Sequence, residues 1–273
     1  MEYNMTHMSL FSGIGAIDLA SHWAGFTTIG QCEIDDYATK VLEKNFPNIS
    51  RWRDIRDVTN KSFRERTGIS TGELTLLSGG FPCQPHSVAG KRKASADERD
   101  LWDEFARVIR EIRPKWVLGE NVRGLLGSEF GRYFGRILRD MDEMGYNVGW
   151  CSYGAVDVGA YHRRERIFIV ANSICERWNS VDKNEKVRRN IAVTKNADNS
   201  ETKPGFNAEP YNIWLCGNGK ITKGSGRTER NDDGLSSGVD RLRCLGNAVV
   251  PQQVYPILKS IAELEKVARR HGV

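Results

Sequence analysis

The sequence predicts an α/β fold of the doubly wound, Rossmann-like kind, in which helices flank a sheet. Short apolar runs that are typical of buried strands alternate along the chain with longer segments of amphipathic helical spacing. A glycine loop, residues 12–16, lies between the first apolar run and the first helix. An acid, Glu33, ends the second run, so the chain begins with the strand–loop–helix–strand order of this fold class.

The remaining elements follow from the same periodicities. Strands are expected at 8–11, 26–33, 53–57 (the edge of a short strand), 74–77, 115–119, 147–153 and 167–171. Helices are expected at 17–23, 37–46, 100–112, 130–144 and 252–269. These assignments divide the chain into segments 1–171, 172–238 and 239–273, of which the first and last share one domain.

The middle segment differs from the rest in composition. From about residue 172 to 235 it is polar, with scattered aromatic side chains and little periodicity, and it is too long for a simple loop. It is either a small irregular domain or an insertion that orders on a partner. Basic residues interleaved with aromatic ones suit contact with nucleic acid.

Composition sets limits on the function. The 273 residues have room for one large domain or for a domain and a small companion, and the net charge of +5 is compatible with a polyanionic partner. None of the six cysteines forms a CxxC pair, so no metal site is expected. We expect neither a signal peptide nor a membrane span, and so a soluble, cytoplasmic protein with reduced thiols.

Cys83 lies in the segment around which the prediction is organised, residues 78–87. A strand that stops at Gly79 and Gly80 and then meets Pro82 must open into a loop. In an α/β sheet this loop places the thiol at the edge where ligands bind. Because an ionised thiol is the strongest side-chain nucleophile, Cys83 is a candidate nucleophile, with a half-buried structural cysteine as the alternative.

The glycine loop predicts a ligand site, because a loop without side chains lets backbone amides approach a ligand at a helix N-terminus. By itself it could also be a tight turn. Glu33 stands about where doubly wound folds place the carboxylate that binds a ribose hydroxyl pair. Asp18 replaces the third glycine of the dinucleotide fingerprint, so NAD is disfavoured and an adenosine ligand without a pyrophosphate fits better.

Glu120 repeats the position of Cys83, just past a predicted central strand. Buried beside a substrate ring it could be held protonated; an ion pair or a helix N-cap is the alternative. The basic stretch 91–99 is either a solvated linker or a lid that touches phosphates.

Three arginines precede the last predicted strand, at 163, 164 and 166. At the mouth of a strand they would form a rim that binds an anion or a carbonyl oxygen. A solvated hairpin, with Glu165 as an internal partner, is the alternative.

Five short motifs occur in one order: Phe11-Ser12-Gly13-Ile14-Gly15, Pro82-Cys83-Gln84, Glu120-Asn121-Val122, Arg164-Glu165-Arg166 and Gly246-Asn247-Ala248-Val249. Together they resemble the DNA (cytosine-5)-methyltransferases over nearly the whole chain apart from residues 172–235. The resemblance implies an S-adenosylmethionine-dependent methyltransferase fold with a mixed sheet, and a target recognition domain at 172–238. The chain departs from the family pattern at Ala16 and His162.

The resemblance also implies a pocket for S-adenosyl-L-methionine. Phe11 would lie against the adenine, Glu33 would bind the ribose and Asp54 would read the adenine amino group. Asn247 and Val249 would close the pocket from the C-terminal end. The cofactor-binding residues expected in this way are Phe11, Ser12, Gly13, Gly15, Glu33, Ile34, Asp54, Ile55, Pro82, Asn247 and Val249.

For the chemistry, the resemblance implies that Cys83 attacks C6 of a flipped cytosine, with Glu120 on its Watson–Crick edge and Arg164 and Arg166 near the base and its phosphate. Double-stranded DNA is the implied partner, a monomer is expected, and a cognate restriction endonuclease is left open. The rival functions are a transfer RNA cytosine-5 methyltransferase and a non-catalytic nucleic-acid-binding protein.

Overall fold

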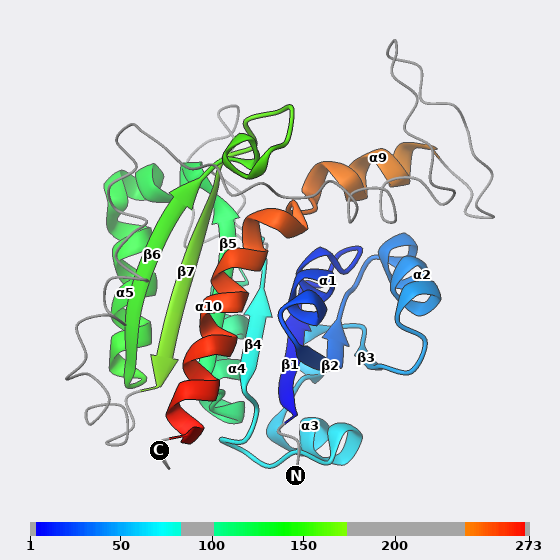
Figure 1. Ribbon diagram of the computed structural model, residues 1–273, viewed down its shortest axis with the longest axis vertical. Helices are drawn as coiled ribbons and strands as arrows, with labels where there is room; N and C mark the ends of the chain where they lie inside the picture. The colour runs from blue at the N-terminus through cyan, green and yellow to red at the C-terminus, as the bar shows by residue number, and fades with distance from the viewer. Residues whose placement is uncertain (1–3, 83–100, 174–237, 271–273) are drawn as a thin grey trace.

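The computed structural model of the chain describes residues 4–82, 101–173 and 238–270 (Figure 1). They contain a seven-stranded sheet in the order β3-β2-β1-β4-β5-β7-β6. The strands are β1 (Met5–Leu10), β2 (Phe26–Cys32), β3 (Ser50–Trp52), β4 (Leu76–Gly79), β5 (Trp116–Val122), β6 (Tyr146–Tyr153) and β7 (Arg166–Ser173). Strands β3, β2, β1, β4 and β5 are parallel, whereas β7 is antiparallel to both of its neighbours. The predicted mixed α/β fold is confirmed.

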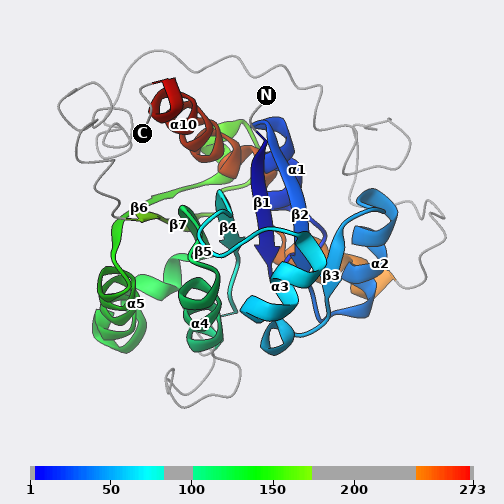
Figure 2. The same cartoon turned by 90° about the horizontal axis from the view of Figure 1, so that it is seen from below.

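Helices cover both faces of this sheet, as Figure 2 shows. One face carries α1 (Ala16–Trp23) and α10 (Pro251–Arg270), which pack on each other. The other face carries α3 (Asn60–Thr67), α4 (Trp102–Ile112) and α5 (Arg132–Glu143). Two further helices of the described residues, α2 (Asp36–Asn45) and α9 (Gly238–Asn247), contact each other.

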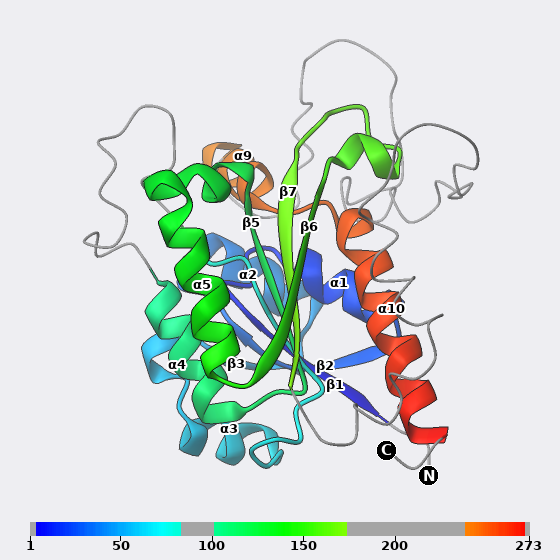
Figure 3. The same cartoon turned by 90° about the vertical axis from the view of Figure 1, so that its left-hand side faces the viewer.

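Each face has its own apolar core. Phe105, Ile109 and Ile137 are fully buried between the sheet and the α4–α5 layer. Val254 and Leu258 of α10 are fully buried against the α1 side. Figure 3 shows β5, β7 and β6 between α5 and α10. Burial of these side chains removes apolar surface from water on both faces, which fixes the sheet as the middle layer.

The order of the strands reverses between β1 and β4, which lie side by side with Leu10 opposite Gly79. In open α/β sheets the carboxyl ends of strands at this point form a crevice where ligands bind. The loops after β1, β2, β4 and β5 leave from this edge. These loops carry several of the predicted site residues, among them Gly13, Glu33 and Pro82.

The structure differs from the sequence prediction in several local features, one of which is α9 (Gly238–Asn247), a helix that no predicted element covers. The third strand lies at Ser50–Trp52 and not at the expected 53–57, which instead contain the 3-10 turn η1 (Ile55–Asp57), capped by Asp54. Helix α3 was not predicted, because Phe63 is its single buried residue and gives no periodicity. Glu120 lies inside β5 and not past it, because pairing with β7 extends β5 to Val122.

Within the described residues, none of the helices combines the length and apolar character that crossing a bilayer requires.

Candidate active site

The glycine loop leaves β1 through a residue in the left-handed region. Phe11 has φ of +53°, a conformation that costs a non-glycine residue about 1–2 kcal/mol and is held here by its surroundings. Its ring meets the ring of Phe105 edge to face at 6.2 Å between centroids. The site therefore begins with a strained aromatic residue propped against α4.

Two glycines of the loop serve different needs. Gly13 has φ of +55°, and a Cβ built on it would meet no atom of the described residues within 4 Å, so among these residues its backbone borders open space. Gly15 has φ of +83°, and its Cβ would lie 2.6 Å from the ring of Phe46, which follows α2. Close approach of a ligand thus remains a prediction for Gly13, whereas packing against Phe46 already explains the absence of a side chain at Gly15.

Ser12 fastens the loop to the end of β2. Its N–H donates to the carbonyl oxygen of Cys32 at 3.0 Å, and its Oγ accepts from the Cys32 N–H at 3.2 Å. The same Oγ lies 2.7 Å from Oγ of Ser9. Because Ser12 is saturated by protein partners, it holds the loop shape more directly than it could hold a ligand.

Asp18 binds Ser9, the hydrogen-bond partner of Ser12. It is fully buried, and its Oδ1 accepts from Ser9 Oγ at 2.9 Å and from Gln31 Nε2 at 3.1 Å. Within the described part of the chain its Oδ2 has no hydrogen-bond partner. Burial raises the pKa of Asp18 to about 6, against which these hydrogen bonds act only in part. The residue that replaced the fingerprint glycine is therefore a buried structural acid.

Glu33 follows β2 and closes the loop from the other side. One carboxylate oxygen accepts the N–H of Gly13 at 2.6 Å, and the other accepts the N–H of Asp35 at 2.8 Å. A carboxylate offers about four acceptor positions, so two donors leave capacity for a pair of hydroxyl groups. Burial raises the pKa of Glu33, and its hydrogen bonds to backbone amides oppose the rise.

The next predicted cofactor residues fall into two environments. Asp54 caps the η1 turn, because its Oδ1 accepts the N–H of Arg56 at 2.9 Å. Ile34 is 70% exposed beside Glu33, an open position for a large apolar side chain. Ile55, by contrast, points into the core on the α4 side, so its side chain is not open to a ligand.

The segment after β4 leads to Cys83, and the description of the chain stops at Pro82, which is half-buried. The Cys83 prediction, like the basic stretch 91–99, lies outside the described residues. Before it, Phe81 is buried against the rings of Trp102 and Phe105. Asn121 Nδ2 donates to the carbonyl oxygen of Phe81 at 3.0 Å. This bond, which the sequence did not reveal, ties the β4 segment to β5.

A buried ion pair stands beside that segment. Arg166 Nε lies 2.8 Å from Oε1 of Glu120, and both side chains are largely buried. Burial raises the pKa of Glu120, while the nearby guanidinium groups of Arg166 and Arg164 oppose the rise. The other oxygen, Oε2, lies 2.8 Å from where a Cβ would stand on Gly80. The absence of a side chain at Gly80 therefore makes room for this carboxylate.

Arg164 is engaged elsewhere. Its Nη2 donates to the carbonyl oxygens of Gly246, at 2.6 Å, and of Ala248. The guanidinium thus anchors the turn between α9 and α10 to the start of β7. Glu165 does not pair with a neighbouring arginine side chain as the hairpin alternative supposed; it accepts from Arg123 at 2.7 Å.

The last motif is divided by the same turn. Asn247 ends α9 and is exposed. Val249 is buried among the apolar residues of the α1 side, with Ala16 and Ile17. Val249 therefore backs the start of α1 from within the core, and its side chain is not a surface for a ligand.

The chain is similar to known proteins in sequence and in fold. A family model described as C-5 cytosine-specific DNA methylase matches residues 5–213. The type II methyltransferase M.PspPI of Psychrobacter is 38% identical over 60% of this chain and 38% of its own length. M.AquIA of Picosynechococcus is 35% identical over 61% of this chain and 71% of its own. M.FnuDI of Fusobacterium nucleatum is 35% identical, and the chain spans 46% of its length.

Solved structures share the fold. A protein described as a DNA modification methyltransferase of an Escherichia coli prophage superposes with a TM-score of 0.55 at 24% identity, over 66% of this chain and 48% of that one. The S. pombe Dnmt2 methyltransferase superposes with a TM-score of 0.51 at 20% identity, over 72% of this chain and 57% of that one.

Proposed function

The chain belongs to the family of C-5 cytosine-specific DNA methylases, and from that membership we propose that it transfers a methyl group from S-adenosylmethionine to C5 of cytosine in DNA. The observation that carries this proposal is the buried Glu120–Arg166 pair. It stands at the carboxyl edge of the sheet, with Oε2 of Glu120 facing Gly80 in the segment that leads to Cys83. The type II methyltransferase names of the relatives at 35–38% identity support the same activity.

The residues at the glycine loop fit an adenosyl ligand. Glu33 keeps acceptor capacity while two backbone N–H groups fix its orientation, which suits the hydroxyl pair of a ribose. Among the described residues Gly13 borders open space, and Ile34, the chain neighbour of Glu33, offers an exposed apolar side chain. When bound, S-adenosylmethionine supplies an electrophilic methyl group on a sulfonium.

In the proposed reaction, the Cys83 thiolate adds to C6 of a cytosine that has left the helix stack. The π electron pair of the C5–C6 bond then becomes available at C5, which would take the methyl group, while the electron pair of the broken methyl–sulfur bond would stay on the sulfur of the departing thioether. Negative charge develops on the N3–O2 side of the ring, where a proton on Glu120 and the guanidinium of Arg166 stabilise it. Removal of the C5 proton and departure of Cys83 restore the aromatic ring.

The environment of Glu120 supports this role. Burial raises the pKa of Glu120 and so favours the protonated carboxyl, while Arg166 and Arg164 oppose the rise. Within the described residues Oε1 is held by Arg166, and Oε2 is left to meet the edge of a base. Arg164 acts one step further away in this proposal: it holds the α9–α10 turn, and with it Val249, against the sheet.

We propose the wider setting on the same grounds. Double-stranded DNA is the substrate, and residues 172–238, which lie almost wholly outside the described chain, form the target recognition domain between the two parts of the catalytic domain. The enzyme acts as a monomer in the cytoplasm. The reducing conditions there keep the Cys83 thiol reduced and so able to act as a nucleophile. The type II names of its relatives support a role beside a cognate restriction endonuclease.

Methyl transfer from isotope-labelled S-adenosylmethionine to duplex DNA tests the proposal, and Cys83→Ser is expected to abolish incorporation. Cys151→Ser is the matched control. Its half-buried thiol in β6 has a pKa raised by burial to about 11, so it is not nucleophilic at neutral pH and activity should persist. Equal incorporation by wild type and Cys83→Ser would remove Cys83 from the mechanism.

The same experiment separates the rival functions. Label that enters transfer RNA and not DNA would replace the proposed substrate. A non-catalytic DNA-binding protein would incorporate no label into either. A covalent adduct with DNA that contains 5-fluorocytosine, lost in Cys83→Ser, would exclude that alternative, because fluorine at C5 blocks the elimination step.

A further inference from the structure

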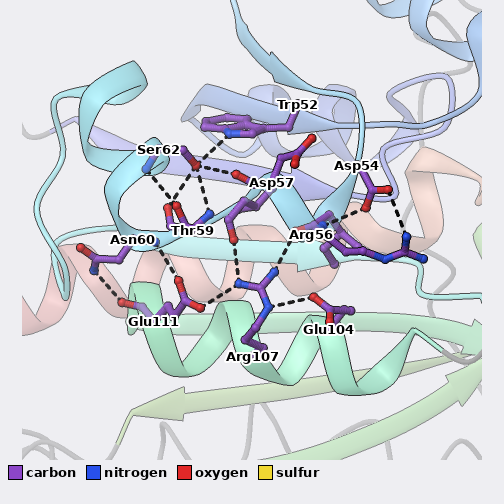
Figure 4. Close-up of polar contacts among 12 residues, drawn as sticks. Trp52, Asp54, Arg56, Asp57, Thr59, Asn60, Ser62, Glu104, Arg107 and Glu111 are labelled. Carbon is purple, nitrogen blue, oxygen red and sulfur yellow. Dashed lines mark hydrogen bonds and ion pairs between the residues drawn. The ribbon is translucent and has the colours of Figure 1, made fainter.

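Arg107 on α4 reaches across to the turn that carries Asp54, as the close-up in Figure 4 shows. Its Nη2 donates to the carbonyl oxygen of Ile55 at 2.9 Å, and its Nη1 donates to the carbonyl oxygen of Val58 at 3.0 Å. These two carbonyls bracket the η1 turn. One guanidinium therefore hydrogen-bonds to the backbone at both ends of the turn.

Two acids of the same helix hold this guanidinium in place. Glu104, one turn earlier, accepts from Nε at 2.8 Å, and Glu111, one turn later, accepts from Nη1 at 2.8 Å. The planar guanidinium can serve four acceptors at once, which an ammonium group cannot do. Arg107 is thus fixed from its own helix before it meets the turn.

Glu111 extends the grip beyond Val58. Its Oε2 accepts the N–H of Asn60 at 2.8 Å, and its backbone carbonyl accepts from Asn60 Nδ2 at 2.8 Å. The chain from Ile55 to Asn60 is therefore tied to α4 at three points. It lies after β3, where strand pairing no longer supports it.

The turn borders the proposed cofactor pocket. The carbonyl oxygen of Trp52, at the end of β3, accepts the N–H of Glu33 at 3.0 Å, so β3 ends beside the residue that we propose binds the ribose, two residues before Asp54. Asp54 in turn caps η1 through the N–H of Arg56. Any movement of η1 must therefore move the Asp54 carboxylate.

We propose that Arg107 is a positioning residue for recognition of the cofactor's adenine: it fixes η1 on α4 and so holds Asp54 where it selects an amino group on the purine. The inference rests on the proposed function only in so far as the ligand is an adenosyl compound. The helix that provides Arg107 also provides Phe105, which packs on Phe11 and Phe81. Helix α4 thus supports the adenine edge, the glycine loop and the segment before Cys83.

Equilibrium binding of two probes tests this without any methyl transfer. S-adenosylhomocysteine carries the purine amino group, and S-inosylhomocysteine carries an oxygen there, which a carboxylate acceptor disfavours. Wild type should prefer the adenosyl probe. Arg107→Met should weaken its binding about tenfold and leave inosyl binding nearly unchanged, so that the preference is lost.

Two further variants make the result specific. If Arg107 acts through Asp54, the effects of Arg107→Met and Asp54→Ala on adenosyl binding should be strongly non-additive in the double variant. Arg136→Met is the matched control. Arg136 on α5 also pairs with two acids, Asp103 and Asp140, but within the described residues it makes no hydrogen bond to the η1 turn. It should keep the wild-type preference.

A loss of thermal stability in Arg107→Met with an unchanged preference between the probes, or additive effects with Asp54→Ala, would overturn the inference. Should Arg107→Met fail to fold, Arg107→Lys keeps the positive charge near Glu104 and Glu111 and is expected to lose the preference as well. Wild type that binds neither probe would also refute it. Wild type that binds the adenosyl probe selectively but does not methylate DNA would refute the proposed function alone.

Discussion

Two regions at the carboxyl edge of the sheet, one beneath the glycine loop (the cofactor side) and one at the end of β5 (the base side), differ in the partners of their buried ionisable groups. Beneath the glycine loop, His7 and Asp18 are fully buried among neutral partners; His7 contacts hydroxyl groups, including Ser78 Oγ at 2.8 Å. At the end of β5, Glu120 is buried against a full opposite charge on Arg166. Burial without a charged partner drives a group toward its neutral form, whereas an ion pair keeps it close to ionisation.

This difference matches the two tasks. The cofactor side must hold a loop in one shape, which neutral hydrogen bonds do without long-range fields. In the reaction that we propose, the base side, at the end of β5, must meet a developing negative charge, which requires a proton and a cation at hand. The comparison predicts that changes on the base side reduce turnover, whereas changes beneath the glycine loop alter stability and its pH dependence.

Glu120→Gln should have the largest effect. It removes the carboxyl proton and leaves Arg166 buried without its partner, so we expect turnover to fall about a thousandfold. Cofactor affinity should stay close to the wild-type value, because Glu33 and the glycine loop are untouched. Steady-state methylation and equilibrium binding of S-adenosylhomocysteine measure the two quantities.

Glu165→Gln is the control for that variant, because Glu165 is next to Arg166 in sequence but pairs with Arg123 at the rim. It should retain activity within a few-fold. A large loss in Glu165→Gln, or an active Glu120→Gln, would show that the rim and not the buried pair carries the effect.

The buried groups beneath the loop should appear in the pH dependence of stability. Burial raises the pKa of Asp18 from 3.8 to about 6, so the folded state holds a proton that the unfolded state has lost, and stability falls as pH rises through this window. Burial lowers the pKa of His7 from 6.5 to about 3, so its contribution falls as pH drops below 6.5. The two slopes have opposite signs and largely offset each other between pH 4 and 6.

Asp18→Asn should therefore gain stability relative to wild type as pH rises from 4 to 7, by about 3 kcal/mol in total, because it no longer ionises a buried acid. Chemical denaturation across this range measures the difference. Asp142→Asn, an exposed position after the middle of α5, is the control and should show a flat difference. A flat difference for Asp18→Asn as well would mean that Asp18 is not neutral in the folded protein near pH 5.

The same contrast explains what the sequence could predict. The glycine loop and Glu33 are local features, separated by one helix and one strand, and the structure joins them through the Gly13 N–H. The motifs also marked Glu120 and Arg166, but their pairing depends on antiparallel strands with Val122 opposite Arg166, which no spacing in the sequence encodes. The same pairing draws Glu120 into β5.

Contacts that depend on three-dimensional packing were not predictable in this way. The ring of Phe46 beside Gly15 and the carbonyls gripped by Arg107 come from elements whose placement the periodicity does not give. Arg107 lies on the polar side of an amphipathic helix, where a solvated charge is the usual interpretation. Acids three residues before it and four after it are the signal that could have marked it as a fixed guanidinium.

Gly80→Ala should have the smallest of these effects. It tests how sensitive turnover is to the position of the Glu120 carboxylate. The new Cβ would lie 2.8 Å from Oε2 of Glu120, closer than atoms can approach, so the carboxylate must move by a few tenths of an ångström. Because a small misplacement of a catalytic group is costly, we expect turnover to fall about tenfold with cofactor affinity unchanged. Gly149→Ala in β6, where an added Cβ would meet no atom of the described residues within 4 Å, should leave activity unchanged. Full activity in Gly80→Ala would mean that Oε2 turns away from this segment when the base binds, and that its position here is not the reactive one.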